Sequence, residues 1–336
     1  MTKKVNQVQS DYKVENILNV KGLKKEFKIG SFTNVRTVHA VNGVDLGIGQ
    51  KEVLGLVGES GSGKTTIARL IAKLYDPTDG KIFLNGKEIP HKMNRKALLN
   101  YRKDVQMVFQ DPFSSLNPLH KVGYTLSRPL KVHKIVNGNN NIKEKIEELL
   151  EECGLTPAKD FTNKYPHELS GGQMQRVGIA RALAVNPKLI LADEPTSMLD
   201  VSIRLDIMNL MLDLKEKNGL SYLFITHDLA GAHYMSDRIA IMYAGFLVEI
   251  GSSDDVINKP MHPYTQLLKK ATPKPESGLE PEKLDITGEV PDLTKLLPGC
   301  QFAPRCPFAK QRCSEEPPKM LQIDENRFVR CFLYKH

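Results

Sequence analysis

Five short motifs between Gly58 and His227 contain the residue types that proteins use to handle phosphate groups. The first is a glycine-rich loop that ends in a lysine and two threonines, Gly58-Glu59-Ser60-Gly61-Ser62-Gly63-Lys64-Thr65-Thr66. The other motifs are Gln110, Leu169-Ser170-Gly171-Gly172-Gln173, Asp193-Glu194 and His227. Together, and in this order, they supply nearly every part needed to bind and split a nucleoside triphosphate.

The glycine-rich loop fits the pattern G-x-x-x-x-G-K-[ST] and lies between a predicted strand and a predicted helix. Because Gly61 and Gly63 have no Cβ, backbone N–H groups of the loop can wrap the β- and γ-phosphates. Lys64 neutralises their charge, Thr65 offers its hydroxyl to Mg²⁺, and the helix N-terminus adds its positive end. The alternative, a turn that precedes a lysine by chance, does not account for the flanking strand and helix.

The acidic pair Asp193-Glu194 follows an apolar run at 189–192 that predicts a buried strand. At the end of this strand, Asp193 can hold the magnesium shell. Glu194 then projects toward the γ-phosphate, where a carboxylate can orient and deprotonate water. The structural alternative is a pair of acids that cap the turn at Pro195. A phosphate loop earlier in the chain favours the catalytic interpretation.

A framework of strands and helices is predicted around these motifs. Short β-leaning segments broken by glycine, at 17–20 and 35–48, indicate an antiparallel group of strands. A strand at 81–84 then meets the hairpin dipeptide Asn85-Gly86. Elsewhere, buried strands alternate with helices, which implies a parallel α/β sheet. These are the strands 52–57, 189–192 and 222–226 and the helices 65–74, 172–185 and 203–214.

Three regions follow from periodicity and composition: an N-terminal tail at 1–16, an α/β domain at 17–258 and a C-terminal extension at 259–336. Helical periodicity over about 90–186 predicts a helical insert between two halves of the sheet. One helix of this insert has a shared apolar face and a glycine cap, formed by Ile142, Ile146, Leu149, Leu150, Cys153 and Gly154. The extension is rich in proline and poor in apolar runs, so we expect a loop-rich segment without a second large core.

The bulk composition is that of a globular protein. The chain has 336 residues, of which 40% are hydrophobic and 26% are charged. No run of eighteen apolar residues suggests a membrane span, and the polar start of the chain lacks a secretory signal, so we expect a cytoplasmic location. The net charge of +8 comes from mixed-sign runs. This pattern favours a solvated basic surface over a nucleic-acid patch, and an anionic membrane face would also tolerate it.

The run Leu169-Ser170-Gly171-Gly172-Gln173 opens a predicted helix inside the helical insert. A second anion-binding helix start on that segment cannot reach the same phosphate within one subunit, but it can serve a nucleotide bound by a partner. At this point the sequence resembles the ATP-binding cassette (ABC) ATPases, over about 20–251 and with every motif in order. The resemblance implies an α/β fold with a parallel core sheet, an antiparallel β subdomain and a helical signature insert.

The resemblance also implies roles for single residues. Phe27 would stack on adenine, although Phe32 is close enough to be confused with it. Gln110 would sense Mg²⁺ and the transport partner, Asp200 would cross between subunits, and His227 would contact the γ-phosphate. The implied catalytic residues are Lys64, Glu194 and His227, and the implied Mg²⁺ site is formed by Thr65, Gln110 and Asp193. Met174 and Met198 depart from the usual pattern but remove no chemical group, so we expect this subunit to hydrolyse ATP.

Four longer strings exceed what the cassette core requires: 110–118, 262–268, 288–291 and 299–307. They resemble the ATPases of oligopeptide, dipeptide and nickel importers, and most closely the F-type subunit. That resemblance implies a second, D-type ATPase subunit in a heterodimer, two transmembrane permease subunits and an external substrate-binding protein. It also implies that this chain is a peripheral subunit at the cytoplasmic face of the membrane. The segment 112–118 is a stiff, partly apolar loop that we expect to form a groove for a short permease helix.

Two other classes of protein are rivals to a peptide or nickel importer subunit. One is a soluble ABC ATPase of DNA repair or translation, but the long coiled coil or second cassette of such proteins is missing from the sequence. The other is a redox-sensing interaction protein in which the C-terminal cysteines are central. Nucleic acid is not an expected partner.

Four cysteines, Cys300, Cys306, Cys313 and Cys331, fall in the last tenth of the chain. Their spacing, C-x5-C-x6-C-x17-C, is looser than that of a zinc ribbon, but four thiolates also suit a [4Fe–4S] cluster. A segment poor in apolar residues favours a bound cofactor over idle thiols. Some members of the resembled family carry an iron–sulfur cluster here, so we prefer the cluster and keep zinc as the alternative. Cys153 fits an apolar helix face.

Overall fold

The computed structural model describes residues 16–30, 35–271 and 291–334. Phe32, the tail before residue 16 and most of the string at 288–291 lie outside these ranges. The described elements are β1 (Asn16–Ile29), β2 (Arg36–Gly49), β3 (Val53–Val57), α1 (Lys64–Ile71), β4 (Asp79–Leu84), β5 (Lys87–Ile89), α2 (Arg95–Asp104), β6 (Val105–Val108), α3 (Pro112–Ser115), α4 (Val122–Val132), α5 (Asn139–Glu152), α6 (Ala158–Thr162), η1 (Pro166–Glu168), α7 (Gly171–Leu183), β7 (Leu189–Asp193), α8 (Val201–Asn218), β8 (Ser221–Thr226), α9 (Leu229–Met235), β9 (Arg238–Tyr243), β10 (Phe246–Ser252), α10 (Ser253–Asn258), α11 (Pro263–Ala271), η2 (Ala303–Arg305), α12 (Gln311–Glu315), β11 (Leu321–Asp324) and β12 (Arg327–Val329).

The central sheet has eight strands in the order β11-β12-β10-β9-β3-β8-β7-β6. Strands β9, β3, β8, β7 and β6 are parallel, and each of the buried strands β3, β7 and β8 is apolar on both faces, as parallel sheets require. A second sheet of four antiparallel strands has the order β2-β1-β4-β5. The predicted parallel core and antiparallel subdomain are therefore confirmed.

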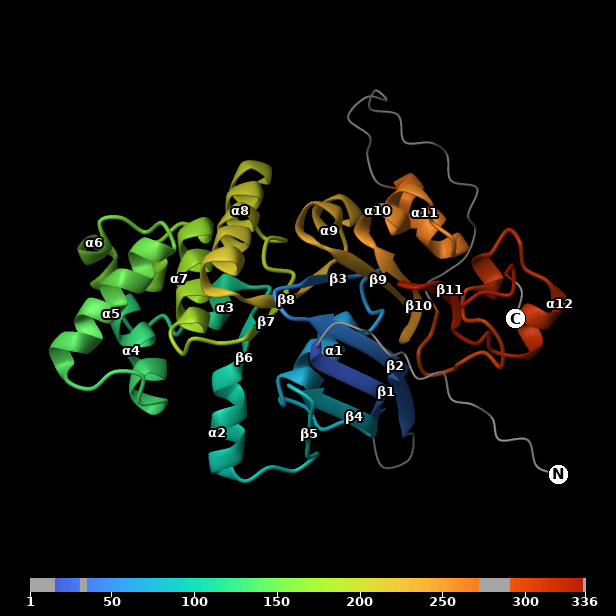
Figure 1. Ribbon diagram of the computed structural model, residues 1–336, viewed down its shortest axis with the longest axis horizontal. Coiled ribbons are helices and arrows are strands. Elements are labelled where there is room, and N and C mark those ends of the chain that lie inside the picture. Colours follow the sequence, from blue (N-terminus) through green and yellow to red (C-terminus); the bar gives the residue numbers. More distant parts are fainter. Residues whose placement is uncertain (1–15, 31–34, 272–290, 335–336) are drawn as a thin grey trace.

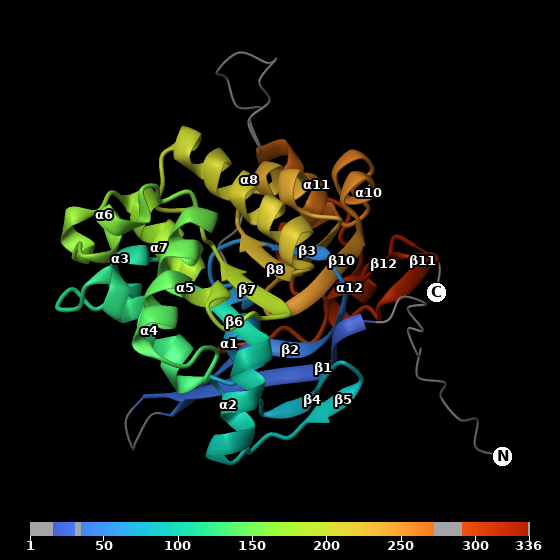
Figure 2. The same cartoon turned by 60° about the vertical axis from the view of Figure 1, so that its left-hand side comes forward.

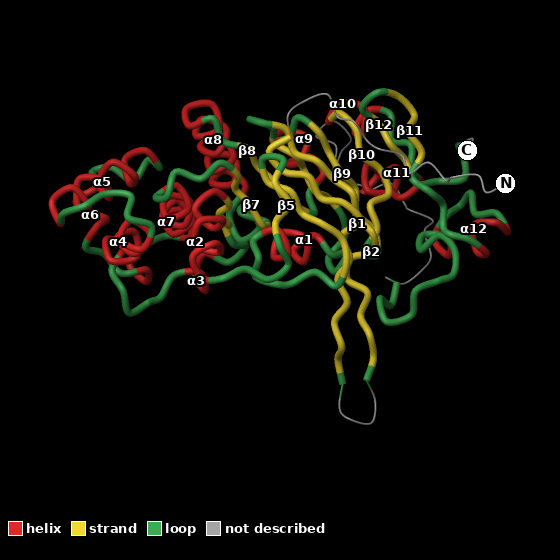
Figure 3. Tube along the Cα trace, turned by 60° about the horizontal axis from the view of Figure 1, so that its bottom comes forward, coloured by secondary structure: helices red, strands yellow, loops and turns green. Residues whose placement is uncertain are grey.

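The antiparallel sheet lies against one face of the central sheet, with α1 between them (Figures 1 and 2). Strands β1 and β2 pair from Asn16↔Gly49 to Ile29↔Arg36, and their far ends project as a two-stranded arm (Figure 3). One apolar core, which includes Leu18, Ile48, Leu56 and Ile67, joins the two sheets to α1. This core holds α1, and thus the loop before it, between the sheets.

The helices α4, α5, α7 and α8 gather at one end of the molecule around a separate core (Figure 1). The predicted apolar face of α5 is buried there, including Ile146, Leu150 and Cys153. Gly154 follows with φ +72°, a left-handed conformation that glycine adopts without strain and that ends the helix. This part of the predicted helical insert is confirmed.

One strand within the range expected to be helical was missed. Residues Val105–Val108 form β6, which pairs in parallel with β7 and is the edge strand of the central sheet. This strand has only four residues, of which Gln106 is polar, and it directly follows the charged helix α2, so the sequence pattern could not separate it from the helix.

The C-terminal extension is joined to the central sheet. Strand β12 pairs with β10, and β11 pairs with β12, so the extension lengthens the sheet at one edge. Phe302 of the extension is fully buried in a core that also contains Tyr243 and Tyr264. The extension thus contributes to a shared core instead of forming its own. Among the described residues, no helix has both the length and the apolarity needed to cross a membrane.

A buried ion pair connects β12 to β10 at this edge of the central sheet. Glu249 of β10 is 0% exposed and Arg327 of β12 is 7% exposed, and the Nη2 atom of Arg327 donates to Oε1 of Glu249 at 3.1 Å. The same carboxylate accepts the backbone N–H groups of Met261 and His262 at 3.0 and 2.8 Å. The carboxylate therefore satisfies donors from both the strand pair and the start of the extension.

We expect Arg327→Met to lower the free energy of unfolding by about 3–5 kcal/mol, because it leaves the Glu249 carboxylate buried without its cation. A urea titration followed by circular dichroism measures this change. Lys81→Met is the matched control, since its ion pair with Glu88 at 3.0 Å is exposed, and its cost should be at most about 1 kcal/mol. Equal losses in the two variants would contradict the assigned role of the buried pair.

Candidate nucleotide site

The glycine-rich loop connects β3 to α1, and its glycines are required by its geometry. Gly61 and Gly63 have φ values of +78° and +101°. A Cβ at Gly63 would lie 2.2 Å from the carbonyl oxygen of Ala40, and a Cβ at Gly58 would lie 2.2 Å from that of Met242. The loop is therefore a tightly packed turn whose N–H groups precede the N-terminus of α1, an arrangement suited to phosphate. The remaining predicted loop residues, Glu59, Ser60, Ser62 and Thr66, lie along it or in the first turn of α1.

Lys64 is buried at the centre of this loop. Its Nζ atom donates to the carbonyl oxygens of Gly58 at 2.7 Å and Glu59 at 2.9 Å. Burial lowers the pKa of Lys64, while the nearby carboxylates of Glu194 and Asp193 act in the opposite direction. The ammonium group is thus held inside the turn that would wrap a phosphate chain.

Thr65 and Asp193 meet directly across the site. The Oγ1 atom of Thr65 donates to Oδ1 of Asp193 at 2.8 Å, although 128 residues separate them in the chain. Asp193 is 3% exposed, and its burial raises the pKa of the carboxyl group. The Thr65 hydroxyl and the Asp193 carboxylate are hard oxygen ligands of the kind that Mg²⁺ prefers. Gln110, the third predicted ligand, contacts Glu194 instead.

The carboxylate of Glu194 is the meeting point of three motifs. Its Oε2 atom lies 3.1 Å from the donating Nε2 of Gln110 and 3.2 Å from Nδ1 of His227. The backbone of Glu194 has φ +45°, a left-handed conformation, and its N–H donates to the Ile225 carbonyl of β8 at 2.9 Å. The turn after β7 therefore aims this side chain at residues that follow β6 and β8.

A pocket beside Glu194 includes residues that the sequence analysis did not name. Besides Glu194 and His227, which were predicted, its lining contains Thr196, Arg204 and Asp228, which were not. Asp228 caps α9 by accepting the N–H groups of the first turn, so its local pattern resembles an ordinary helix cap. No motif in the sequence distinguishes these neighbours from structural residues.

The segment at 169–173 begins α7 as predicted. Ser170 caps this helix, with its Oγ accepting the N–H of Gln173 at 3.3 Å, and the Gln173 side chain accepts the N–H of Ser170 at 3.1 Å. A Cβ at Gly172 would lie 2.7 Å from Ile203, and one at Gly171 would lie 3.3 Å from Leu199. The start of α7 therefore packs closely against the first turn of α8 and the segment before it.

The segment 169–173 at the start of α7 lies apart from the glycine-rich loop of its own chain. Figure 1 shows α7 within the helical layer and α1 beneath the centre of the main sheet. Asp200, the residue predicted to cross between subunits, is exposed directly before α8. The structure thus divides the predicted site residues into two groups, one around Lys64 and one around Ser170.

Phe27 lies on the arm formed by β1 and β2 and is half-buried. Its ring makes an edge contact with Tyr75 at 5.4 Å between centroids, and Nζ of Lys25 lies 5.0 Å from its centroid. Its adenine-stacking role stays a prediction.

The segment after Gln110 forms the short helix α3 and a turn. Pro112 and Leu116 are buried, whereas Phe113 and Leu119 are 58% and 81% exposed. Phe109, at the end of β6, also exposes its ring and lies beneath the guanidinium of Arg181 at 5.9 Å. Part of the predicted prolyl-aromatic loop is therefore an exposed apolar surface next to Gln110.

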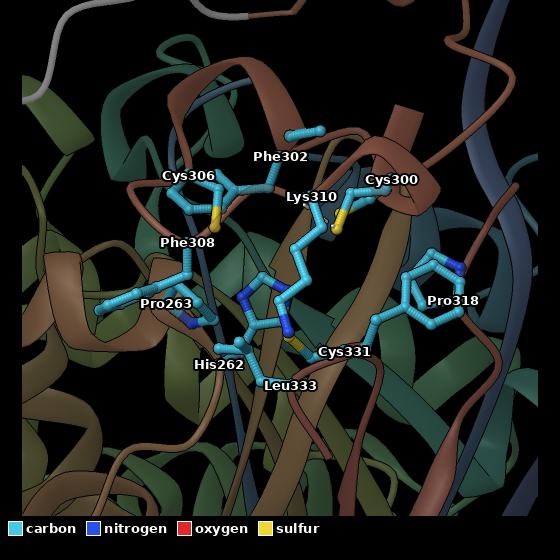
Figure 4. A pocket seen from close by; sticks show the side chains of 13 residues that line it. His262, Pro263, Cys300, Phe302, Cys306, Phe308, Lys310, Pro318, Cys331 and Leu333 are labelled. Carbon is cyan, nitrogen blue, oxygen red and sulfur yellow. Dashed lines mark hydrogen bonds between the residues drawn. The ribbon is translucent and has the colours of Figure 1, made fainter. Parts of the chain in front are cut away.

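The four C-terminal cysteines line one pocket together with His262, Phe302 and other residues of the extension (Figure 4). Burial raises the pKa of Cys300 to about 11. His262 is fully buried, which lowers its pKa to about 3, and its Nδ1 accepts the N–H of Tyr264 at 3.1 Å. Across the part of the chain that the structure describes, no group of three or more His, Cys, Asp or Glu side chains is arranged to hold a metal ion. Neither the predicted [4Fe–4S] cluster nor the zinc alternative therefore gains support from the arrangement of these side chains.

The fold and the loop around Lys64 define a P-loop ATPase of the ABC class. The ABC transporter family matches residues 41–197, and the C-terminal region of the oligopeptide/dipeptide transporter family matches residues 248–313. The oligopeptide transport ATP-binding protein AppF of Bacillus subtilis is 43% identical over 95% of this chain and 98% of its own length. The dipeptide transport ATP-binding protein DppF of Haemophilus influenzae is 39% identical over 94% of this chain and 96% of its own length.

Among solved structures, the dimeric ATP-binding cassette MJ0796, in a post-hydrolysis state bound to ADP and Pi, is similar with a TM-score of 0.63 and 31% identity. This match covers 70% of this chain and 98% of that one. The chain belongs to the family of ATP-binding subunits of oligopeptide and dipeptide ABC transporters, and it is an ATPase.

Gly63→Ala tests the loop geometry. We expect it to weaken ATP binding at least about tenfold and to destabilise the fold by at least about 1 kcal/mol, because it adds both a backbone clash and a strained φ angle. Equilibrium binding of labelled ATP and thermal unfolding measure the two effects.

Gly178→Ala in α7 is the matched control, since no atom lies within 4 Å of the added Cβ. It should be neutral or stabilise the fold by up to about 1 kcal/mol, because alanine favours a helix interior. Normal ATP binding by the Gly63 variant would show that the loop tolerates a side chain there.

Proposed function

We propose that this chain powers the import of oligopeptides or dipeptides by hydrolysing ATP at the site around Lys64. The observation that carries the proposal is the convergence of Gln110 and His227 on one carboxylate oxygen of Glu194. Glu194 directly follows Asp193, which ends β7 and accepts the hydrogen bond from Thr65. A phosphate loop, a magnesium site and a positioned base in one place are the parts that triphosphate hydrolysis needs.

In this proposal each residue has a separate task. The loop N–H groups and Lys64 hold the β- and γ-phosphates, and Thr65, Asp193 and Gln110 provide the oxygen ligands for Mg²⁺. When bound, Mg²⁺ neutralises charge that develops on the phosphate oxygens. Glu194 orients the attacking water and accepts its proton, while His227 contacts the γ-phosphate.

The second group of residues serves a nucleotide held by another subunit. The start of α7, with Ser170, Gly171, Gly172 and Gln173, is separated from its own loop, and helix N-termini bind anions. Asp200 lies next to it at the exposed start of α8. ATP held between two subunits stabilises the closed dimer relative to the open one, and release of phosphate reopens it. The similarity to a dimeric cassette supports this arrangement.

The partners we propose are a second, D-type ATPase subunit, two transmembrane permease subunits and, indirectly, an external substrate-binding protein. Phe109, Phe113 and Leu119, on either side of Gln110 in the sequence, have exposed apolar side chains that suit contact with a short permease helix at the cytoplasmic face of the membrane. Peptide is the proposed cargo because several relatives are named oligopeptide or dipeptide transport proteins.

We further propose a [4Fe–4S] cluster in the extension. Four cysteines line a pocket that is otherwise mainly apolar, with Phe302, Phe308 and Pro318 among its residues. A cluster spaces its four thiolates around a core larger than one ion. Four cysteine thiols that share a pocket, but are not arranged to hold one metal ion, therefore fit such a cluster. When bound, the cluster would link the four cysteines and so stabilise the loop-rich extension.

Glu194→Gln is expected to keep ATP binding but to lower the rate of hydrolysis at least about 10²-fold, since the amide cannot accept a proton from water. Phosphate release measures the rate, and light scattering with the partner subunit and MgATP should detect a trapped closed dimer. Glu88→Gln, at an exposed glutamate of β5, is the matched control and should hydrolyse ATP at the normal rate.

Lys64→Ala gives a contrasting defect. It removes the cation that holds the phosphates, so it should weaken the binding of labelled ATP itself at least about tenfold. For the other variant, rapid hydrolysis of ATP by Glu194→Gln would refute the role of Glu194 as the base.

Anaerobically purified protein is expected to contain about four iron and about four sulfide ions per chain if the cluster proposal holds. Cys306→Ser should lose most of this iron, because it removes one of the thiolate ligands. Cys153→Ala should keep it, since Cys153 lies in the helical core. Metal analysis that finds zinc, or no metal at all, would contradict the cluster.

A further inference from the structure

The glycine-rich loop is held by two side chains that lie more than 200 residues later in the chain. Both guanidinium Nη atoms of Arg305 donate to the Glu59 carboxylate, with Nη1–Oε2 at 3.0 Å and Nη2–Oε1 at 3.1 Å. The hydroxyl of Tyr264 accepts the backbone N–H of Glu59 at 2.9 Å. The second residue of the loop is thus fixed through both its side chain and its backbone.

Tyr264 belongs to a cluster of packed aromatic rings, and Arg305 packs against this cluster. Tyr264 and Phe302 are fully buried, and their ring centroids lie 5.5 Å apart. Tyr243 packs against both rings, at 4.6 and 5.2 Å. The guanidinium of Arg305 lies over the rings of Tyr243 and Phe302 at 5.8 and 5.9 Å. The side chains of Arg305 and Glu59 are 12% and 27% exposed, so their fork-shaped contact is partly shielded from water.

Glu59 also contacts the binding lysine. Its carbonyl oxygen accepts a hydrogen bond from Nζ of Lys64 at 2.9 Å and one from the N–H of Ser62 at 3.2 Å. A shift of Glu59 would therefore move an acceptor that places the Lys64 ammonium and would change the turn that presents the loop N–H groups.

We propose that Arg305 is a positioning residue for the phosphate loop and that it acts through Glu59. It orders the loop before nucleotide arrives, so less of the binding free energy is used to order it. The pattern G-x-x-x-x-G-K-[ST] leaves the position of Glu59 open, so this support comes from the extension and not from the loop motif. The inference rests on the proposed role of the loop in binding ATP.

The test is a double-mutant cycle on the full-length chain, with equilibrium binding of labelled MgATP as the readout. Arg305→Met should raise the Kd about tenfold, equivalent to about 1.4 kcal/mol. Arg305→Lys should give a smaller rise, because it keeps the charge but not the two-pronged contact. In a Glu59→Gln background, Arg305→Met should change the Kd less than about twofold, since the shared partner is already altered.

Arg312→Met is the matched control. Arg312 is an exposed arginine of the same extension whose partner is Glu316, so its loss should leave the Kd unchanged. The turnover number at saturating ATP should fall less than about threefold in Arg305→Met, because its effect is on binding.

Two results would overturn the inference. One is an unchanged Kd in both Arg305 variants while Lys64→Ala weakens binding, which would leave the proposed function intact. The other is an equal rise in Kd with and without Glu59→Gln, since a purely structural role of Arg305 would not depend on Glu59. If Lys64→Ala bound ATP normally, the proposed phosphate site would itself be wrong, and the role of Arg305 with it.

Discussion

The parallel register of β6, β7, β3 and β8 is the constraint on which the site depends. Parallel strands in one sheet end at the same edge, so residues that follow them in the chain are brought together however far apart they are in sequence. The glycine-rich loop follows β3, Gln110 comes shortly after β6, Glu194 follows β7 and His227 follows β8. A one-residue slip of any of these strands would turn its apolar side chains toward the opposite face and displace the group at its end. The apolar residues that fill both faces of the sheet therefore set the geometry of the polar ones at its edge.

Burial gives these polar groups different properties within a few ångströms. Desolvation raises the pKa of Asp193 and lowers that of Lys64, so burial alone opposes the charge on both. Their mutual proximity and the hydrogen bonds from Thr65 and to the loop carbonyls oppose that tendency. Glu194 is more accessible and is contacted by an amide and an imidazole. The site thus combines an enclosed part suited to holding charges with an open part suited to admitting water.

The features of the site that the sequence predicts are those that depend on residues close together in the chain. Gly61 and Gly63 are needed for left-handed turns that only a few residues accept, and the apolar runs of β3, β7 and β8 are long enough to be recognised. Strand β6 was missed because a run of four residues, Val-Gln-Met-Val, is too short to show a distinctive period. The contacts of Tyr264 and Arg305 with Glu59 span 205 and 246 residues. Nothing near either residue in the sequence indicates its partner, because the pairing results from the way the extension folds back onto the sheet.

The extension links the cysteine pocket to the phosphate loop through one short segment. Phe302 lines the pocket and packs on Tyr264, and Arg305 directly precedes Cys306, which lines it too (Figure 4). Phe302 therefore borders both the pocket and the aromatic rings of Tyr243 and Tyr264. A group bound in the pocket, such as the proposed cluster, would contact the segment that carries Arg305, and Arg305 contacts Glu59 of the loop. If binding in the pocket changed the affinity of the loop for nucleotide, thermodynamic linkage would require nucleotide to change the affinity of the pocket by the same factor.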